Sequence, residues 1–331
     1  MNILIFEYIT GGGLVGEALP ASLVGEGELM LNTVSEDLSE LDDVQVSVMR
    51  DYRLQSNKQA KYEYIVDAKN GFADVIECVA KTIDALLIIA PESEGILSTL
   101  CEEYSNHEFI MLNSTSKCVA LVSDKLKTYK YLKCFNIPQI PTYEMSDVKL
   151  INSDKIIIKP KDGVGCERIH LLEISNNSSD VVNQFDTHNY IAQPYIQGQS
   201  ASLSLLCWDG KCKLLSVNIQ NIEEIEDGLE LKGCVVNALE HDRFVEFSNS
   251  LIKTLPDLRG YVGVDILISK DKVLLVEVNP RLTTSYAGLS SALDVNPAGL
   301  ILQTFIDQKL PEFFVSQETS ITVNIGAERA A

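Results

Sequence analysis

Three oxygen-bearing side chains lie within one short stretch, GYVGVDILISKDKVLLVEVNPRL, which predicts two apolar strands joined by a turn. Asp265 lies on the first strand, and Glu277 and Asn279 lie on the second. Residues two apart on a strand point to the same face, so Glu277 and Asn279 project together. Carboxylate and amide oxygens are hard ligands that suit Mg²⁺ held jointly with triphosphate oxygens. We therefore predict a metal site formed by Asp265, Glu277 and Asn279.

Glu277 interrupts the apolar run from Leu274 to Val278, where burying a carboxylate is costly unless a cation or a partner offsets its charge. A salt bridge between Glu277 and Arg281 is the structural alternative to a metal. In the functional interpretation, Arg281 instead stabilises the charge of a transferring phosphoryl group or an acyl phosphate. Arg281 is therefore the predicted catalytic residue.

The turn between the two strands decides whether Asp265 and Glu277 can share a metal. Directly opposed residues of an antiparallel pair share a face, and opposing these two carboxylates requires an odd number of loop residues. We predict a three-residue turn at Lys270-Asp271-Lys272, with one residue in the left-handed conformation that Asp tolerates. A two- or four-residue turn would send the carboxylates to opposite faces unless a β-bulge restores the phase.

A glycine loop with lysines on its rim joins two other apolar runs, in the stretch KIIIKPKDGVGCERIHLL. Gly163 and Gly165 would let backbone N–H groups approach phosphate oxygens, while Lys159 supplies a positive charge at the strand end. The alternative is an ordinary hairpin that turns at Asp162-Gly163.

The stretch YIAQPYIQGQSASLSLL predicts a strand, a hinge through Gly198 and a second strand. A nucleotide base that lies beside such a hinge can be recognised by backbone N–H and C=O groups. An ordinary hairpin is again the alternative.

A third glycine-rich stretch, GGGLVGE, satisfies G-x-G-x-x-G with Gly11, Gly13 and Gly16. A dinucleotide fingerprint requires the glycines to follow a strand directly and to open a helix. Here four residues separate the first strand from Gly11, and Pro20 cuts short a helix that starts at Gly16. We therefore favour a glycine loop after the first strand, with a nicotinamide site as the alternative.

Composition limits the classes of protein to which these stretches can belong. The 331 residues suffice for two or three domains, and 46% of them are hydrophobic. The 27 basic and 47 acidic residues give a net charge of -20, which repels phosphate backbones and argues against nucleic acid. Eight cysteines without a C-x-x-C pair and four histidines give no zinc pattern. The apolar runs are too short to span a bilayer, so we expect a cytoplasmic protein with no membrane partner.

The elements that must position these residues change in kind near residue 113. Up to there, helical and strand-like segments alternate, which predicts an open parallel sheet. The strands are expected at Ile3–Phe6, Val44–Met49 and Ala85–Ala90, and the helices at Glu26–Leu41 and Phe72–Ile83.

The rest of the chain predicts antiparallel α+β structure. A helix opens at Ser123-Asp124-Lys125 and ends before Pro138. From about Lys155 onward, strands alternate with turns rather than with long helices. We expect three domains, at residues 1–112, 113–190 and 191–331.

The order of these motifs resembles that of the ATP-grasp ligases over about residues 115–300. The motifs are S-D-K at 123–125, I-I-I-K-P-K-D-G-V-G, Q-P-Y-I-Q-G and V-E-V-N-P-R. The opening F-E-Y-I-T-G-G-G and the ending V-E-V-N-P-R-L-T-T-S look most like the tyramine–glutamate ligases of methanofuran biosynthesis, part of one-carbon metabolism, and their relatives in methylotrophic bacteria.

The resemblance implies a three-part fold and a ligase reaction. The fold combines an N-terminal open parallel α/β domain, a small lid domain that carries the glycine loop, and a larger antiparallel domain, with ATP held between the last two. In the implied reaction, ATP phosphorylates a carboxylate, and an amine then attacks the acyl phosphate to give an amide, ADP and phosphate. The implied carboxylate is glutamate, and the implied amine is similar to tyramine or tyrosine.

The resemblance also implies a role for each matching residue. Lys125 and Lys159 would hold the phosphates of ATP, residues 162–168 would cover them, and Arg281 would steady the acyl phosphate. Asp265, Glu277 and Asn279 would bind Mg²⁺, with Mn²⁺ as an alternative metal. The implied ATP-binding residues are Lys125, Lys159, Lys161, Gly163, Gly165, Cys166, Gln193, Tyr195, Ile196 and Ser200.

Departures from the family pattern leave some roles open. Ser200 stands where many members have a glutamate for the ribose hydroxyls, Cys166 replaces a small polar residue, and Gln193 replaces a frequent glutamate at the adenine hinge. The GGGLVGE stretch is expected to face the amino-acid pocket. The candidate substrate-binding residues are Glu7, Thr10, Gly12 and Thr284.

Alternative functions remain open at this stage. The ligase could act on other amino acids or on a peptide, because the motifs do not fix the shape of the acceptor pocket. A non-catalytic nucleotide-binding subunit and a dehydrogenase are the further alternatives. The expected partners are small-molecule amino acids and amines, and a homodimer is left open.

Overall fold

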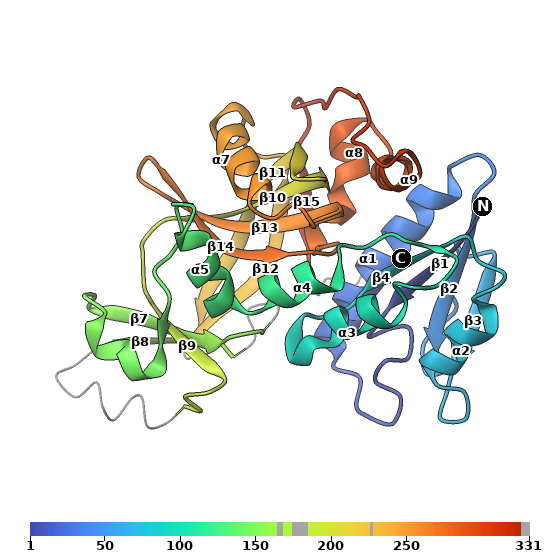
Figure 1. Cartoon of the computed structure of the whole chain (residues 1–331), viewed down its shortest axis with the longest axis horizontal. Coiled ribbons are helices and arrows are strands. Elements are labelled where there is room, and N and C mark those ends of the chain that lie inside the picture. Colours follow the sequence, from blue (N-terminus) through green and yellow to red (C-terminus); the bar gives the residue numbers. More distant parts are fainter. Residues whose placement is uncertain (164–167, 174–184, 226–227, 326–331) are drawn as a thin grey trace.

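The computed structural model of the chain describes residues 1–163, 168–173, 185–225 and 228–325, and three β-sheets follow one another along this part of the chain (Figure 1). The first sheet is parallel, and the other two are built from antiparallel strand pairs. The predicted combination of a parallel α/β part with antiparallel parts is therefore confirmed. No helix of the described residues is long and apolar enough to cross a membrane.

The first sheet has the strand order β3-β2-β1-β4-β5, with all neighbours parallel. Strand β4 is apolar along its whole length and β1 is apolar from Ile3 to Phe6, as expected for strands covered on both faces. The strands are β1 (Asn2–Glu7), β2 (Gln45–Asp51), β3 (Tyr62–Val66), β4 (Ala85–Ile89) and β5 (Ile110–Met111). The sequence analysis missed β3, which lies at the sheet edge and exposes Tyr62 and Ile65.

Helices form the connections of this sheet except the one between β2 and β3. They are α1 (Ala21–Ser39), α2 (Phe72–Val79), η1 (Ser93–Gly95) and α3 (Ile96–Glu103). Helix α1 starts five residues earlier than predicted, directly after Pro20, which takes the N-cap position. The GGGLVGE stretch forms turns and opens no helix, so the arrangement that a dinucleotide fingerprint needs is absent there.

Two helices, α4 (Ser116–Ser123) and α5 (Lys125–Lys133), link the first sheet to the next. Asp124 caps α5, because its carboxylate accepts hydrogen bonds from the backbone N–H groups of Leu126 at 3.0 Å and Lys127 at 2.9 Å. The predicted helix start at Ser123-Asp124-Lys125 is therefore confirmed. The cap also fixes the position of Lys125 at the first turn of α5.

The second sheet is small and has the order β6-β9-β7-β8. Its strands are β6 (Tyr143–Glu144), β7 (Lys155–Pro160), β8 (His170–Glu173) and β9 (Tyr190–Pro194), with η2 (Met145–Leu150) packed beside them. It has a small core of its own, formed by Met145, Val148, Ile151, Ile156, Ile158 and Ala192. Figure 1 shows this sheet as a separate lobe at one end of the molecule, which suits a lid.

The third sheet has the order β14-β13-β10-β11-β12-β15 and is antiparallel throughout. Its strands are β10 (Gln199–Trp208), β11 (Lys211–Ile225), β12 (Gly228–Val236), β13 (Gly260–Ser269), β14 (Lys272–Asn279) and β15 (Ile321–Asn324). The helices that pack against it are α7 (Asp242–Lys253), η3 (Thr284–Gly288), α8 (Leu289–Leu293) and α9 (Pro297–Asp307).

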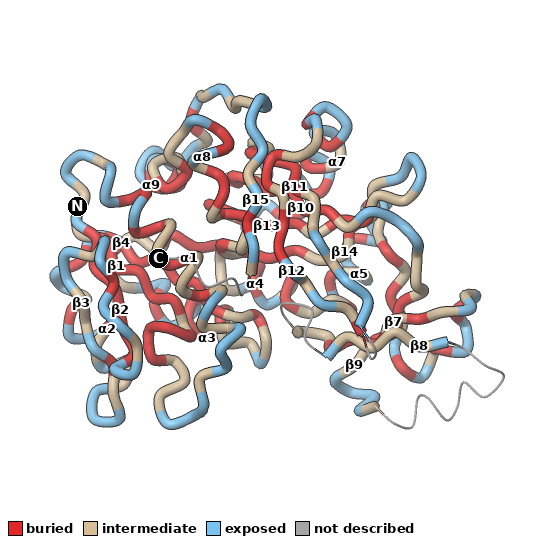
Figure 2. The backbone as a smooth tube through the Cα atoms, turned by 180° about the vertical axis from the view of Figure 1, so that it is seen from behind, coloured by how far each residue is buried: buried red, intermediate tan, exposed pale blue. Residues whose placement is uncertain are grey.

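The first and third sheets share one hydrophobic core. Residues of β1 and α1, such as Ile3 and Leu31, pack in the same cluster as Leu206 of β10 and Leu289 of α8. Figure 2 shows buried stretches, in red, in both halves of the molecule. The N-terminal part is therefore packed firmly against the large sheet, and α1 lies between them.

Candidate active site

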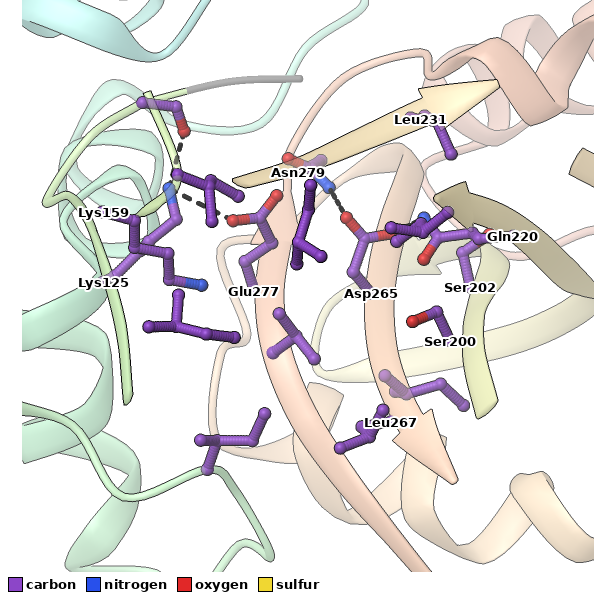
Figure 3. Close-up of a pocket in the computed structure, with 18 of the residues that line it drawn as sticks. Lys125, Lys159, Ser200, Ser202, Gln220, Leu231, Asp265, Leu267, Glu277 and Asn279 are labelled. Carbon is purple, nitrogen blue, oxygen red and sulfur yellow. Dashed lines mark hydrogen bonds and ion pairs between the residues drawn. The ribbon is translucent and has the colours of Figure 1, made fainter. Parts of the chain in front are cut away.

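A pocket of about 290 Å³ lies between the small sheet and the large sheet (Figure 3). Strands β7 and β9 line one wall, and strands β10 to β14 line the other. The structure brings most of the predicted site residues to this pocket. They are Lys125, Lys159, Gly163, Gln193, Tyr195, Ile196, Ser200, Asp265, Glu277, Asn279, Arg281 and Thr284.

Asp265 and Glu277 lie directly opposite each other on β13 and β14, but the predicted turn is wrong. Ser269 pairs with Lys272, which leaves a two-residue loop, and Lys270 adopts the left-handed conformation with a φ of 55°. The register shifts by one residue between Asp265 and the next position of β13. This β-bulge restores the phase that an even loop would lose, so both carboxylates line the same pocket.

Side chains from three elements orient the two carboxylates. Gln220 Nε2 donates to Asp265 Oδ1 at 2.9 Å, and Asn279 Nδ2 donates to Asp265 Oδ2 at 3.2 Å. Lys125 Nζ lies 3.1 Å from Glu277 Oε2. Figure 3 shows Glu277 between the two lysines on one side and Asp265 on the other. The partner of Glu277 is therefore Lys125, and the alternative salt bridge to Arg281 is wrong.

The electrostatics of this pair favour an added cation. Burial raises the pKa of Asp265, and the negative charge of Glu277 raises it further. Burial also opposes ionisation of Glu277, but Lys125 and Lys159 outweigh it and lower the pKa of that carboxyl. A divalent cation would reduce the repulsion between two like charges held side by side in a buried site.

The donor set fits Mg²⁺. Asp265 and Glu277 offer carboxylate oxygens, and the amide oxygen of Asn279 remains available because its nitrogen contacts Asp265. The described part of the chain holds no cluster of three or more His, Cys, Asp or Glu side chains that could bind a metal. The predicted metal site therefore depends on an amide as its third ligand.

Lys125 and Lys159 converge on the pocket from different elements. Lys159 is the penultimate residue of β7 and is 5% exposed. Lys125, at the start of α5, donates from Nζ to the backbone oxygen of Gly163 at 2.6 Å and so touches the glycine loop. Lys161 does not line the pocket, and Gly165 and Cys166 lie outside the described residues.

The hinge after β9 forms the opposite end of the pocket. Gln193 Nε2 donates to Thr142 Oγ1 at 2.8 Å, which leaves the amide oxygen as its remaining acceptor. Tyr195 donates from its hydroxyl to Glu224 Oε1 at 2.8 Å. Apolar side chains form the walls around this hinge, as an adenine base requires. They are Ile140, Ile157, Ile222, Leu229, Leu231 and Leu267.

Arg281 is held by a residue that the sequence analysis missed. Arg281 Nε donates to Glu92 Oε1 at 2.9 Å and Oε2 at 3.0 Å, and Nη1 donates to the backbone oxygen of Leu282 at 3.0 Å. Glu92 follows β4 in the first part of the chain and is 4% exposed. No local signal could have revealed this pair, because 189 positions separate the two residues.

Three of the predicted substrate-binding residues do not line the pocket. Glu7 accepts hydrogen bonds from the backbone N–H and the hydroxyl of Thr10, both at 2.6 Å, and both residues are buried. Gly12 has a φ of +93°, and a Cβ there would lie 2.5 Å from Val66. Glu7, Thr10 and Gly12 thus build a packed turn after β1, and the expectation that they face the pocket is wrong.

Helix α1 supplies the pocket residues of the first part of the chain. Glu26 and Met30, one turn apart, both line the pocket beside Arg281, Thr283 and Thr284. The amphipathic spacing of α1 was visible in the sequence, but nothing local distinguishes Glu26 from the solvent-facing acidic residues of the same helix.

Comparisons with known proteins agree with this geometry. A family model for the ATP-grasp domain matches residues 122–285, and a model for the pre ATP-grasp 3 domain matches residues 44–119. The chain is 29% identical over 297 residues to the tyramine–L-glutamate ligase of Methanocaldococcus fervens, which covers 87% of this chain and 89% of that protein. It is 27% identical over 293 residues to the protein of the same name from Methanocaldococcus jannaschii, covering 87% and 85%.

The fold has a solved counterpart. The crystal structure of an ATP-grasp superfamily protein from Archaeoglobus fulgidus aligns with a TM-score of 0.71 and 24% identity, over 98% of this chain and 99% of that one. The two family models meet near the junction of α4 and α5, and together they span nearly all residues from 44 to 285. Residues 122–285 of the chain therefore form an ATP-grasp domain.

Proposed function

We propose that the chain is an ADP-forming ligase that joins the side-chain carboxylate of glutamate to a primary amine of the tyramine type. One observation carries the proposal: Lys125, Lys159, the three oxygen ligands and Arg281 line a single pocket. The names of the two curated relatives support the choice of glutamate and tyramine. The apolar hinge at the other end of the pocket supports ATP as the phosphoryl donor.

In the first step, a carboxylate oxygen of glutamate attacks the γ-phosphorus of ATP, and the bond between that phosphorus and the bridging oxygen of ADP breaks. Lys125 and Lys159 hold the phosphates by charge, which positions the phosphoryl group for attack. Asp265, Glu277 and Asn279 would hold Mg²⁺, which neutralises phosphate charge when bound. Arg281 stabilises the charge that builds on the transferred group.

In the second step, the amine nitrogen attacks the carbonyl carbon of the acyl phosphate. A C–N bond forms, the C–O bond to phosphate breaks with its electron pair going to phosphate, and a proton passes from the nitrogen to the departing phosphate. Arg281 remains beside the leaving phosphate, since Glu92 and Leu282 fix its guanidinium group. The guanidinium has five N–H donors, so several remain available for phosphate oxygens.

The test is a product analysis with a labelled substrate. The purified chain is incubated with ATP, Mg²⁺, a panel of amines, and glutamate whose side-chain carboxylate carries oxygen-18. The proposal expects ADP, the amide and phosphate containing one labelled oxygen, with no AMP. Reactions without amine or without glutamate serve as controls.

Two outcomes would contradict the proposal. AMP with labelled oxygen would indicate an acyl adenylate in place of an acyl phosphate. Tight ATP binding without turnover on any amino acid and amine of the panel would favour the alternative of a non-catalytic nucleotide-binding subunit. An amide formed with a different amino acid would retain the ligase and replace the carboxylate substrate.

A further inference from the structure

Glu26 stands out among the acidic side chains of the pocket. Four of the described lining residues are acidic, and three of them have an evident place: Asp265 and Glu277 in the metal set, and Glu224 at the hinge beside Tyr195. Glu26 comes from α1, which packs against η3, the element that begins at Thr284. The first part of the chain thus adds a carboxylate to the pocket.

The packing of α1 fixes where Glu26 lies. Gly27, its neighbour, has no side chain, and a Cβ there would lie 2.6 Å from Glu7 Oε2, so the helix rests directly on that carboxylate. At the other end of α1, Asp37 accepts a hydrogen bond from the hydroxyl of Tyr286 at 2.7 Å. With both ends held, the helix presents Glu26 and Met30 to the pocket from one face.

The charges at this end of the pocket define what Glu26 can bind. Arg281, Lys125 and Lys159 bring three cationic side chains to the pocket that Glu26 also lines. A substrate ammonium that enters beside Arg281 and the lysines is repelled by them. A carboxylate at the same end offsets this repulsion and accepts a charge-assisted hydrogen bond.

We propose that Glu26 binds the primary ammonium group of a substrate, with Met30 contacting the apolar carbon chain next to that group. The inference rests on the proposed ligase function and adds the residue that selects an amine. The ammonium can come from two sources, the acceptor amine before it loses its proton or the α-ammonium group of the amino acid. Glu26 is a specificity residue in either case.

Equilibrium binding tests the inference without any turnover. The full chain is loaded with Mg²⁺ and a non-hydrolysable ATP analogue and titrated with tyramine and, separately, with glutamate. Glu26→Gln removes the charge and keeps the shape, so the affinity for one of the two probes is expected to fall roughly 10-fold or more, as for a lost hydrogen bond to a charged group. Affinity for the ATP analogue is expected to stay unchanged and reports that the variant is folded.

The titrations with tyramine and with glutamate distinguish the two possible sources of the ammonium group. Weaker binding of tyramine alone assigns Glu26 to the acceptor amine, and weaker binding of glutamate alone assigns it to the α-ammonium group. Unchanged binding of both probes overturns the inference, as does a wild-type protein that binds neither. Glu36→Gln is the matched control, because Glu36 is an exposed residue of the same helix that does not line the pocket.

Hydroxylamine separates a failure of this inference from a failure of the proposed function. This nucleophile is largely uncharged at neutral pH and traps an acyl phosphate as a hydroxamate. Hydroxamate formation by the wild-type protein with ATP and glutamate supports the ligase whatever Glu26 binds. If Glu26 holds the acceptor amine, Glu26→Gln keeps its hydroxamate rate while amide formation at low tyramine falls. Equal losses in both rates, with glutamate binding unchanged, would overturn the inference and leave the ligase in place.

Discussion

Arg281 and Glu92 form a buried ion pair that ties the end of the large sheet to the end of a strand in the parallel sheet. Both carboxylate oxygens of Glu92 accept from Arg281 Nε, at 2.9 and 3.0 Å, and the side chains are 14% and 5% exposed. Breaking such a pair is more costly than its net contribution to stability, because it leaves a buried charge without a partner. Glu92 is therefore a positioning residue for Arg281.

We expect Glu92→Gln to lower the turnover number by roughly 10-fold or more, because the amide holds the guanidinium with one neutral acceptor in place of two charged ones. ATP affinity is expected to change much less, and Glu92→Asp is expected to recover part of the rate. Steady-state kinetics and a separate ATP titration check this. Glu94→Gln is the control, because Glu94 is an exposed residue of η1, which directly follows Glu92. Equal losses of turnover and ATP affinity would contradict a positioning role.

Arg281→Ala is expected to depress turnover far more than ATP affinity, since its charge acts on negative charge that develops during transfer. The measurement is the turnover number at saturating ATP, set beside the dissociation constant of the ATP analogue. Similar losses in the two quantities would make Arg281 a binding or structural residue.

Lys159→Ala is expected to weaken ATP binding by about 1.5–3 kcal/mol, the usual worth of a hydrogen bond to a charged group. Titration with the ATP analogue measures the change. Lys161→Ala is the matched control, because Lys161 lies two residues away and does not line the pocket. An unchanged affinity in the Lys159 variant, or an equal loss in the control, would count against the phosphate role.

Asp265→Asn is expected to stabilise the protein without metal and to abolish the extra stability that Mg²⁺ and ATP confer together. Burial and Glu277 disfavour the charged form of Asp265, so removing the charge relieves repulsion, while the same change deletes a metal ligand. Thermal unfolding with and without Mg²⁺ and ATP checks both halves. Asp271→Asn, in the exposed hairpin loop, is the control. Full stabilisation of the Asp265 variant by Mg²⁺ and ATP would contradict the metal assignment.

We predict that Asp37 makes the free energy of unfolding depend on pH. Burial raises its pKa from 3.8 to about 6, so between these values the folded chain binds more protons than the unfolded chain, and the free energy of unfolding falls as pH rises. Asp37→Asn keeps an acceptor for the Tyr286 hydroxyl and removes this titration. Above pH 6 the free energy of unfolding of the variant is expected to exceed that of the wild type by about 1–3 kcal/mol, because each tenfold change in proton affinity corresponds to roughly 1.4 kcal/mol.

Chemical denaturation from pH 4 to pH 8 measures this difference. The gain of the Asp37 variant is expected to shrink as pH falls toward 4, because the carboxyl is then protonated in the folded chain and the pH approaches the pKa of 3.8 of the unfolded chain. Glu36→Gln, the exposed neighbour, is expected to show no such trend. A difference between variant and wild type that does not vary with pH would refute the assignment.

Local features of the fold could be read from the sequence because their causes are local. Asp124 caps α5 through backbone groups two and three residues away, and the apolar runs at β1 and β4 are buried along their length. The edge strand β3 was missed because its side chains are half solvated, so its apolar pattern is weak. The start of α1 was predicted too late in the chain for a similar reason, since the exposed first turn of this helix carries no core-facing apolar pattern.

The sequence by itself determined which residue types can hold phosphates and a metal, and in which order along the chain they occur. It also placed Glu277 and Asn279 on one face, because the period of a strand is a property of the backbone alone. Tertiary structure decided the phase between Asp265 and Glu277, where a bulge compensates a two-residue loop. It also decided that Arg281 pairs with Glu92 and that Glu26 of α1 lines the pocket. These contacts join segments that only the packing of separate sheets brings together, so no local pattern encodes them.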